Sequence, residues 1–423
     1  MSSALPSYEQ AAALVADYAA KLSRLRPPAA RVDLGMAAGR VLARPLCADR
    51  DQPPFTRSTQ DGFACRALEA STHGLLDLVG ASRAGEAPAG PLPPGAAWEI
   101  MTGAPVPAGA DAVAMSEHVK VAGKQVRLRP PRTVSPGENV VAQGAQARRG
   151  DELLATGTAI RFPQIALAAA CGYAAIDVFV RPRVAILTTG DELVSVESSP
   201  APGKIRNSNA PMLAAMVAAA GGEPWVLPTA ADHARSLDRA LAQAAEADLL
   251  LISGGVSAGK FDLVEPALAR AGARFHFTGV RIQPGKPLVF GELPVRNAHA
   301  VQKENGTKCF FGLPGNPVSS AVTFLLFAAP VLAALAGGLE PSPRFALARL
   351  ATKANKHGKI GFTRFLPASC TFSAAAGRLP EVALVPTHGS GDLAALARSN
   401  CFLVVPEDDH GLKAGAIVHI LLF

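Results

Sequence analysis

Cysteine, aromatic and charged residues are all scarce in this chain of 423 residues. No two of its six cysteines lie within four positions of each other, which excludes the Cys-x-x-Cys spacing of zinc ribbons and redox motifs. Aromatic residues make up 5% of the chain, too few for the stacked rings with which many proteins hold single-stranded nucleic acid. The net charge of +7 is a mild excess that does not indicate a nucleic-acid partner and fits an enzyme of small anionic substrates equally well.

Signals for export or membrane insertion are also lacking. The N-terminal sequence has no basic segment followed by an apolar run, which together with the scattered cysteines predicts a reducing, cytoplasmic location. The apolar run 321–336 is shorter than the about 20 residues that a membrane span needs, and Pro330 interrupts it. We therefore interpret this run as a buried helix and expect no membrane partner.

The residues that are present indicate a multidomain α/β protein. Hydrophobic residues make up 49% of the chain, and 35 prolines with 39 glycines indicate many turns. At about 150 residues per domain, the length predicts several domains. The expected boundaries are 1–50 with 145–180 for an extended and helical linker domain, 51–144 for a β-rich domain, 181–336 for a central α/β domain and 337–423 for a C-terminal β-barrel.

Strands and helices alternate in the central domain. The run Leu249–Ile252 is entirely apolar, as in a strand that is covered on both faces. Helices are expected at 211–220, at 232–245 with Asp232 as the N-cap, at 263–271 and after Pro317. This alternation predicts a parallel sheet with helices on both faces.

Four polar loops rich in glycine and proline lie at the strand ends of this domain. They are 188–192, 253–262, 283–287 and 312–317. Ligands of open parallel sheets bind at the carboxyl ends of the strands, so these loops predict a binding site. The helix after Asn316, its expected N-cap, offers an N-terminus to an anion. Three carboxylates suit a Mg²⁺ ion that is shared with a substrate phosphate: Asp191, Glu192 and Asp262.

Two motifs inside the second loop point to other chemistries. Gly254–Lys260 matches the start of a phosphate-binding P-loop, but Phe261 stands where a hydroxyl residue would bind Mg²⁺. Gly255–Gly259 matches the Gly-x-Ser-x-Gly elbow of α/β-hydrolases, with Ser257 as the nucleophile. That elbow does not directly follow the strand, and its candidate acid and base, Asp392 and His410, fall in the β-rich C-terminal region. A hydrolase stays open as an alternative.

Taken together, the loops resemble one family, the molybdopterin molybdenumtransferases, to which the C-terminal domain of gephyrin also belongs. The resemblance runs in order from about residue 8 to the end of the chain. Its motifs are Ser-Thr-Gln-Asp-Gly-Phe-Ala at 58–64, Ile-Met-Thr-Gly-Ala-Pro-Val-Pro at 100–107, Thr-Thr-Gly-Asp-Glu-Leu at 188–193, Ser-Gly-Gly-Val-Ser-Ala-Gly-Lys-Phe-Asp at 253–262, Pro-Gly-Lys-Pro at 284–287, Gly-Leu-Pro-Gly-Asn-Pro at 312–317, Gly-Phe-Thr-Arg at 361–364 and His-Gly-Ser-Gly at 388–391.

The resemblance implies a reaction and an assembly. The central domain would bind molybdopterin, and the substrates would be adenylated molybdopterin and molybdate. With Mg²⁺, the enzyme would cleave the phosphoanhydride, insert molybdenum into the dithiolene and release AMP. The family also implies a homodimer whose site lies between subunits, with the adenylyltransferase and molybdoenzyme apoproteins as further partners.

The same resemblance assigns roles to individual residues. Those that match catalytic positions are Asp61, Thr102, Glu192, Asp232 and Asp262. Those expected to bind substrate are Gly254, Gly255, Ser257, Lys286, Pro314, Gly315, Asn316, Pro317, Ser319, Arg364 and Ser390. Molybdate is a dianion, so the cationic and hydroxyl side chains in this set are expected around it. Asp232 also has a purely structural interpretation as an N-cap, and Asp61 as a turn residue before a glycine.

The chain departs from the family pattern at several positions. Gln60 replaces the usual Met, Gln283 replaces a second Lys, Gln146 replaces an Asp, and 294–308 is an insertion. These departures leave two alternative functions open. A molybdopterin adenylyltransferase would share the α/β domain without needing the β-rich domains, and a scaffold paralogue would release no AMP.

Overall fold

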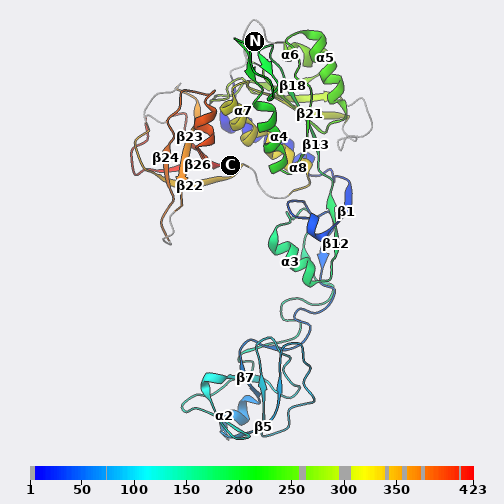
Figure 1. The fold of residues 1–423 in the computed structure, drawn as a ribbon, viewed down its shortest axis with the longest axis vertical. Coiled ribbons are helices and arrows are strands. Elements are labelled where there is room, and N and C mark those ends of the chain that lie inside the picture. Colours follow the sequence, from blue (N-terminus) through cyan, green and yellow to red (C-terminus); the bar gives the residue numbers. More distant parts are fainter. Residues whose placement is uncertain are drawn as a thin grey trace. The chain divides into compact units, whose positions relative to one another are not determined.

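The computed structural model describes residues 5–72, 74–256, 263–294, 306–338, 343–354, 360–372, 377–408 and 411–423. The chain forms two compact units, each built from segments that are separate in the sequence (Figure 1). The first unit comprises residues 1–43, 157–161 and 175–423, and the second comprises 44–156 and 162–174.

A six-stranded sheet forms the centre of the first unit, in the order β16-β13-β17-β21-β20-β18. Its strands are β13 (Arg183–Thr188), β16 (Glu223–Val226), β17 (Leu249–Ser253), β18 (Arg274–Thr278), β20 (Val289–Pro294) and β21 (Thr307–Leu313). Among these described strands, β20 alone runs against the others. The prediction of a wholly parallel sheet is therefore wrong for β20. The reason is the segment 279–288, described throughout, which joins β18 to β20 without the crossover helix that a parallel neighbour needs.

Helices cover both faces of this sheet, as the sequence predicted. They are α1 (Tyr8–Leu22), α4 (Asn209–Ala219), α5 (Ala234–Gln243), α6 (Val264–Arg270), α7 (Pro317–Thr323) and α8 (Ala329–Leu335). Helices α1, α4, α7 and α8 pack into one apolar cluster, and α5 and α6 into another. Helix α1 begins at a capping box in which Ser7 and Gln10 each satisfy the other's backbone N–H, and it lies against α8.

The apolar run near residue 330 is one continuous helix, Pro317–Leu335. It is the one helix in the described part of the chain that is long and apolar enough to cross a membrane, yet 83% of its apolar window is buried inside the structure. Pro330 does not interrupt it, contrary to the sequence prediction. A π-helical turn, Phe324–Ala328, ends two residues before Pro330. In a regular α-helix the proline ring would clash with the carbonyl four residues earlier, which belongs to Leu326 within this turn.

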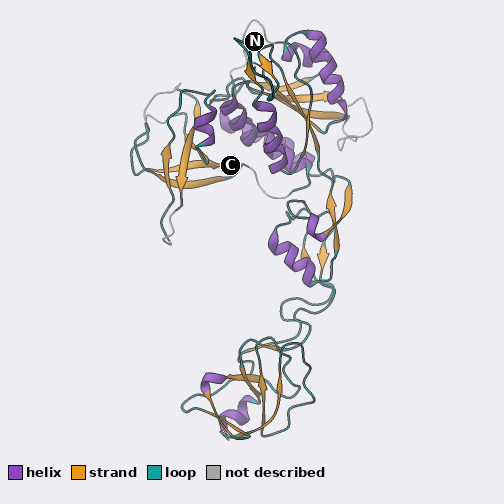
Figure 2. Ribbon diagram, viewed as in Figure 1, coloured by secondary structure: helices purple, strands orange, loops and turns teal. Residues whose placement is uncertain are grey.

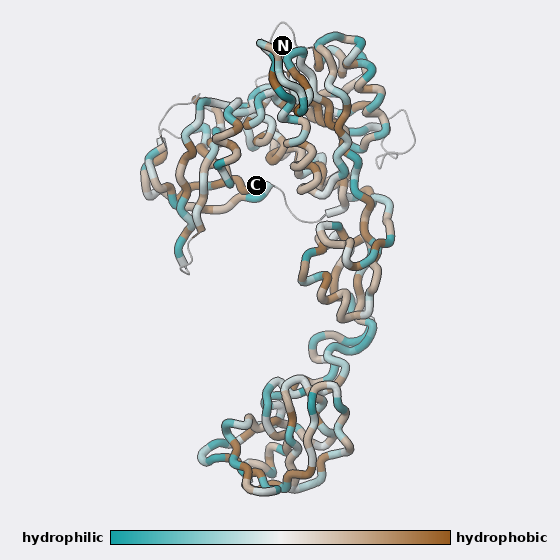
Figure 3. The backbone as a smooth tube through the Cα atoms, viewed as in Figure 1, coloured by the Kyte–Doolittle hydropathy of each residue, from teal (hydrophilic) through white to brown (hydrophobic). Residues whose placement is uncertain are grey.

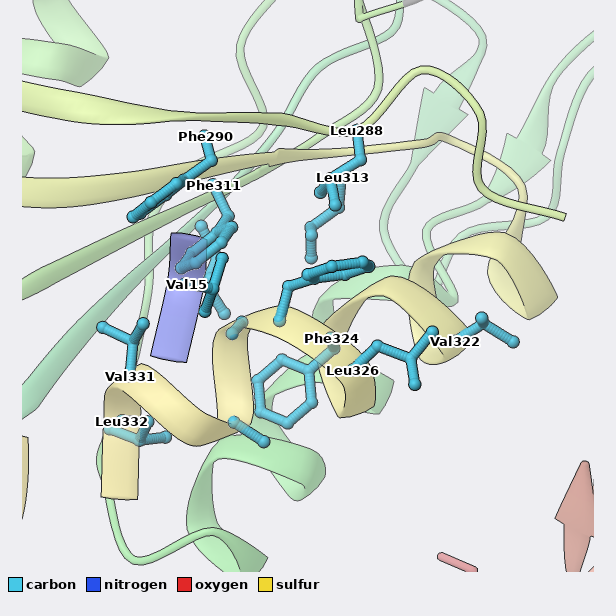
Figure 4. Close-up of a cluster of buried hydrophobic side chains, with 14 of the residues drawn as sticks. Val15, Leu288, Phe290, Phe311, Leu313, Val322, Phe324, Leu326, Val331 and Leu332 are labelled. Carbon is cyan, nitrogen blue, oxygen red and sulfur yellow. The ribbon is translucent and has the colours of Figure 1, made fainter. Parts of the chain in front are cut away.

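The core between this helix and the sheet is aromatic (Figure 4). Phe290 of β20 stacks on Phe311 of β21 with 4.6 Å between ring centroids, and both side chains are fully buried. Phe277 of β18 connects this layer to Phe327 of the helix, with its ring centroid 5.6 Å from that of Phe290 and 6.3 Å from that of Phe327. Val15 reaches the layer from α1. Hydrophobic residues follow the central strands (Figure 3), so polar side chains are left to the strand ends.

A closed five-stranded β-barrel forms the C-terminal part of the first unit (Figure 2). Its strands are β22 (Phe345–Leu350), β23 (Thr363–Thr371), β24 (Glu381–Leu384), β25 (Cys401–Val405) and β26 (Ile417–Leu422), and β23 pairs with both β24 and β25 to close it. The short strand β19 (Ile282–Gln283) joins β23, and α9 (Leu393–Ala397) precedes β25. This architecture confirms the predicted barrel. Two small pairs complete the unit: β1 (Ala29–Asp33) with β12 (Ala175–Phe179), and β14 (Leu193–Val194) with β15 (Ile205–Arg206).

The second unit contains another six-stranded sheet, in the order β7-β4-β6-β5-β9-β8. Its strands are β4 (Gly62–Cys65), β5 (Leu76–Ser82), β6 (Ala96–Ile100), β7 (Ala112–Met115), β8 (Val119–Ala122) and β9 (Gln125–Leu128). Its other described strands and α-helices are β2 (Leu46–Cys47), β3 (Arg57–Ser58), β10 (Val140–Val141), β11 (Glu152–Leu154), α2 (Ala67–Thr72) and α3 (Phe162–Ala170). The β-rich character expected for this region is confirmed.

Candidate active site

The polar loops of the first unit meet at one edge of its sheet. Strand pairing aligns Thr188 of β13 with Ser253 of β17, and Ser253 with Leu313 of β21, so three loops leave the sheet at the same level. Val289, at the start of the antiparallel β20, pairs with Gly312. The loop 283–287 therefore lies at this edge too, although it enters a strand rather than leaving one.

Two carboxylates at this edge hold each other's loops. Asp191 Oδ1 accepts a hydrogen bond from the Asp232 backbone N–H at 3.0 Å, and Asp232 Oδ2 accepts one from the Asp191 N–H at 3.3 Å. Thr189 Oγ1 donates to Asp232 Oδ1 at 2.6 Å, and Lys204 Nζ donates to the Asp191 carbonyl at 2.6 Å. The two loops that follow β13 and β16 are thus joined through side chains predicted to be functional.

Asp232 is not the N-cap of the following helix, which corrects the structural interpretation of this residue. Helix α5 is capped instead by His233, whose Nδ1 accepts a hydrogen bond from the Ser236 N–H at 3.1 Å. An N-cap side chain must face the first turn of its helix, whereas the Asp232 carboxylate faces the loop after β13. Its geometry therefore favours the site interpretation.

Glu192 is exposed beside this pair. A Cβ atom on Gly190 would lie 2.6 Å from a Glu192 carboxylate oxygen, and Gly190 has a φ of +151°. Glycine at position 190 therefore leaves the space into which the Glu192 carboxylate turns back.

The loop after β17 begins with two glycines in left-handed backbone conformations. Gly254 has a φ of +97°, and a Cβ atom there would lie 2.5 Å from the Thr189 carbonyl oxygen. This close approach requires glycine and brings the loop against its neighbour. Ser257 and Asp262 lie outside the described residues, so their predicted roles stay predictions.

Two asparagines that the sequence motifs did not mark connect the ends of β13 and β17 to the loops after β16 and β21. Asn207 Nδ2 donates to Thr188 Oγ1 at 2.8 Å and to Thr229 Oγ1 at 3.1 Å. Asn209 Nδ2 donates to Ser253 Oγ at 2.9 Å and to the Gly315 carbonyl at 2.6 Å. The available signal was the pair of asparagines within the four residues before Pro211, from which only the start of a helix was predicted.

The C-terminal barrel contributes Ser390 to this edge. Asn316 Nδ2 donates to Ser390 Oγ at 2.8 Å, and the Ser390 carbonyl accepts from the Val318 N–H at 3.0 Å. Asn316 is the N-cap of α7 by position, as predicted, but its side chain bonds the barrel loop rather than the described helix N–H groups. The barrel is thereby joined to the N-terminal end of the helix.

Asp392 shapes the Ser390 loop. Its carboxylate accepts hydrogen bonds from the Ala395 N–H at 2.9 Å and the His388 N–H at 3.1 Å, which hold the pKa of Asp392 below its usual value. Both oxygens are therefore engaged with backbone groups. This disfavours Asp392 as the acid of a hydrolase triad, whose other candidate, His410, lies outside the described residues.

The predicted oxyanion ligands differ in their exposure. Lys286 is exposed, whereas Arg364 and Ser319 are 5% and 4% exposed. Arg364 is the Cα partner of Gln283 across β19 and β23, which brings the barrel next to the loop that carries Lys286. These positions are compatible with the predicted roles, which remain predictions.

Asp61 and Thr102 form a separate pair within the second unit. The Thr102 N–H donates to Asp61 Oδ1 at 2.6 Å, and the Thr102 hydroxyl donates to the same oxygen at 2.7 Å. These two donors lower the pKa of Asp61. Two residues that lie 41 positions apart in separate motifs are therefore in contact, and the turn interpretation of Asp61 does not account for its bonds to Thr102.

Comparison with known proteins identifies the family. A molybdopterin molybdenumtransferase of Nostoc sp. is 34% identical over 403 residues, covering 92% of this chain and 88% of the relative. The chain belongs to the molybdopterin molybdenumtransferase family. A relative of the same name from Bacillus subtilis is 34% identical over 397 residues, covering 90% of this chain and 87% of the relative.

Family models match both units. The MoeA N-terminal region (domains I and II) matches residues 6–172, the probable molybdopterin binding domain matches 185–334, and the MoeA C-terminal region (domain IV) matches 348–423. The crystal structure of the molybdopterin biosynthesis MoeA protein from Pyrococcus horikoshii has a TM-score of 0.77 at 29% identity, covering 99% of this chain and 100% of that one.

The motif-based recognition is thus confirmed. The chain is an enzyme of molybdenum cofactor biosynthesis with molybdopterin molybdenumtransferase activity. Because the match extends over the regions on both sides of the α/β domain, it favours this activity over that of an adenylyltransferase.

Proposed function

We propose that the carboxyl edge of the α/β sheet binds adenylated molybdopterin and molybdate, cleaves the phosphoanhydride and releases AMP as molybdenum is inserted. The observation that carries this proposal is the contact between the Asp191–Asp232 pair, the glycine turn at Gly254 and their neighbouring loops at one edge. Backbone N–H groups and hydroxyls there can donate hydrogen bonds to phosphate oxygens. The carboxylates can bind a cation or accept a proton from water.

The donor chemistry at this edge fits Mg²⁺. Asp191, Glu192 and Asp232 offer carboxylate oxygens, the ligands that Mg²⁺ prefers. Among the described residues, no group of three or more His, Cys, Asp or Glu side chains is placed to hold a metal by itself. The ion that we propose would be shared with substrate phosphates and held by Asp191 and Glu192 together with the predicted ligand Asp262. When bound, Mg²⁺ would neutralise phosphate charge and polarise the bond to be cleaved.

The chain's own residues would orient the substrate. Ser390 and Asn316 offer hydroxyl and amide donors beside the N-terminus of α7, where the helix dipole favours an anion. Lys286 and Arg364 would balance the charge of molybdate, with the planar guanidinium binding two oxygens at once. Asp191 and Asp232 would keep the neighbouring loop closed around the phosphates.

AMP release tests this proposal directly. Purified protein is incubated with adenylated molybdopterin, molybdate and Mg²⁺, and AMP is quantified by chromatography, with parallel samples lacking molybdate or containing EDTA. The proposal expects AMP to accumulate with all components and to fall sharply with EDTA. If no AMP forms, the chain acts as a scaffold; if AMP forms equally with EDTA, the metal assignment is wrong.

A homodimer is also proposed. The support is that Asp61 and Thr102 match functional positions of the family but belong to the second unit. A two-fold dimer is the commonest oligomer and would let one subunit complete the site of the other. Light scattering should give about twice the chain mass of 43.5 kDa at micromolar concentration, whereas the mass of a single chain would overturn the dimer.

A further inference from the structure

The segment Asn207–Asn209 contacts the ends of two strands and the loops that follow two others. It leads into α4, and its two amide side chains reach in different directions along the edge of the sheet. Asn207 joins the end of β13 to the loop after β16 through Thr188 and Thr229. Asn209 joins the end of β17 to the loop after β21 through Ser253 and Gly315.

The two asparagines differ in how completely their polar atoms are paired. Asn207 Oδ1 accepts a hydrogen bond from the Ala210 N–H at 3.1 Å, so its amide is fully used in starting α4 and joining two loops. Asn209 Oδ1 is buried and has no hydrogen-bond partner among the described residues. A buried acceptor without a partner costs free energy, which favours a role of the Asn209 side chain at the site beside its role in the fold.

The loops joined by Asn209 approach each other closely. A Cβ atom on Gly315 would lie 3.5 Å from the Gly254 Cα, and the Gly254 N–H donates to the Leu313 carbonyl at 3.2 Å. Ser253 Oγ is 3.5 Å from the Pro314 carbonyl, at the limit of a hydrogen bond. The two short bonds of Asn209 Nδ2 are therefore the strongest described side-chain connection between these loops.

We propose that Asn209 is a positioning residue, which fixes the Gly254–Gly255 turn against Gly315 before the substrate binds. This inference rests on the function proposed above, since both loops belong to the proposed substrate site. A loop that is ordered in advance does not have to be ordered by the substrate, so the benefit appears mainly as tighter binding. The unpaired Asn209 Oδ1 is the acceptor left over when the amide commits both N–H groups to the loops.

The variants separate hydrogen bonding from folding. Asn209→Asp keeps the size of the side chain but cannot donate to the Gly315 carbonyl, and a carboxylate in the first turn of α4 favours the helix. Asn209→Ala removes the whole group. Ser208→Ala is the matched control, because Ser208 makes no side-chain cap bond to the described helix. Asn207→Ala serves as a comparison for a purely structural role. It removes an amide whose hydrogen bonds are all made within the fold, so it should lower the melting temperature.

Two measurements decide the proposal. The first is the KM for adenylated molybdopterin and the kcat of AMP release: both Asn209 variants should raise KM by about tenfold, the loss expected for hydrogen bonds of this kind, with kcat changed less than KM. The second is amide hydrogen exchange without substrate, which should be faster at 253–256 and 313–316 in Asn209→Asp than in Ser208→Ala.

Unchanged exchange in Asn209→Asp would overturn the positioning role, as would a KM equal to that of wild type. A fall in kcat with an unaltered KM would also contradict it, since it would indicate a role in the chemical step. The exchange measurement needs no substrate. If wild-type protein releases no AMP, the proposed function fails while hydrogen exchange still decides whether Asn209 holds the loops.

Discussion

The two units use strand ends in different ways. In the first unit, β13, β17 and β21 are buried along almost their whole length. The loops at one edge of this sheet are hydrogen-bonded to one another through side chains, and we call them interlocked loops. In the second unit, Asp61 and Thr102 form a single exposed pair beside β4 and β6. A site made of interlocked loops should depend on the core beneath it, whereas an exposed pair should be separable from the stability of its sheet.

The two tryptophans allow this comparison to be tested unit by unit. Trp98 is buried in the second unit, where its indole N–H donates to Ser82 Oγ at 2.7 Å, and Trp225 lies in the first unit under the guanidinium of Arg183. In a Trp98→Phe background, fluorescence reports the first unit. In a Trp225→Phe background, it reports the second.

The largest effect on stability is expected for Phe311→Ala. This change removes a fully buried ring that stacks on Phe290, so it should cost the first unit about 3–5 kcal/mol of unfolding free energy. Urea unfolding of the Trp98→Phe background measures the loss. The second unit, followed through Trp98, should keep its midpoint; an equal shift of both transitions would break the distinction between the units.

The next effect concerns Lys308, which is buried at the opposite end of β21 and donates to the Ala244 carbonyl. Burial lowers the pKa of Lys308 to about 8 from a usual value of 10.5. The unfolded chain therefore binds more protons between these values, so the unfolding free energy should rise with pH from about 8 to about 10.5, by up to about 3 kcal/mol.

Lys308→Met provides the control for that rise. The variant carries no titrating group at this position. The unfolding free energy of wild type should therefore rise relative to that of the variant across the same pH range. If the unfolding free energies of the two proteins change in parallel with pH, burial of Lys308 does not lower its pKa.

A smaller effect is expected for Gly254→Ala measured against Gly221→Ala. Both glycines have positive φ and share the cost of that conformation, but only the Cβ at 254 would meet a backbone atom, the Thr189 carbonyl oxygen. Gly254→Ala should therefore lose about 1–3 kcal/mol more than Gly221→Ala, and AMP release should fall with it. Equal losses in chemical denaturation would mean that the loops at this edge are not tightly packed.

The smallest effect on stability is expected for Asp61→Asn. The pKa of Asp61 is lowered, so its carboxylate contributes stability above the usual value of 3.8 and loses it as pH falls. Because the pair is exposed, the midpoint followed through Trp98 should hardly move, while AMP release falls about tenfold or more. Thr102→Val should reproduce this result. Normal AMP release in both variants would remove the second unit from the site.

The sequence predicts much of the first unit because its signals are local. The apolar run Leu249–Ile252 and the glycine-rich loops identify the strands and the edge where ligands bind. The reversed direction of β20 was not predictable in this way, because β20 reads as a buried strand in either direction. The misassigned cap shows the same limit: Asp232 and His233 are adjacent, and only the path of the chain decides which one faces the helix.

The contacts that complete the site are long-range and had no local signal. Ser390 meets Asn316 because the barrel packs against α7, and Asn209 meets Gly315 because α4 starts between two strand ends. The family motifs marked Ser390 and Asn316 as functional without giving their contact. Asn209 fell outside those motifs, so only the structure brought it into the site.

The central claim is that the interlocked edge of the first unit performs the reaction, and Asp232→Asn tests it most directly. The change keeps the size of the side chain but replaces the charged acceptor of the Thr189 hydroxyl by an amide. Asp238→Asn, on the exposed surface of α5, is the matched control. The rate of AMP release with Mg²⁺ and molybdate should fall by about 10- to 100-fold in Asp232→Asn and stay at the wild-type value in Asp238→Asn. Equal rates in the two variants would contradict the account.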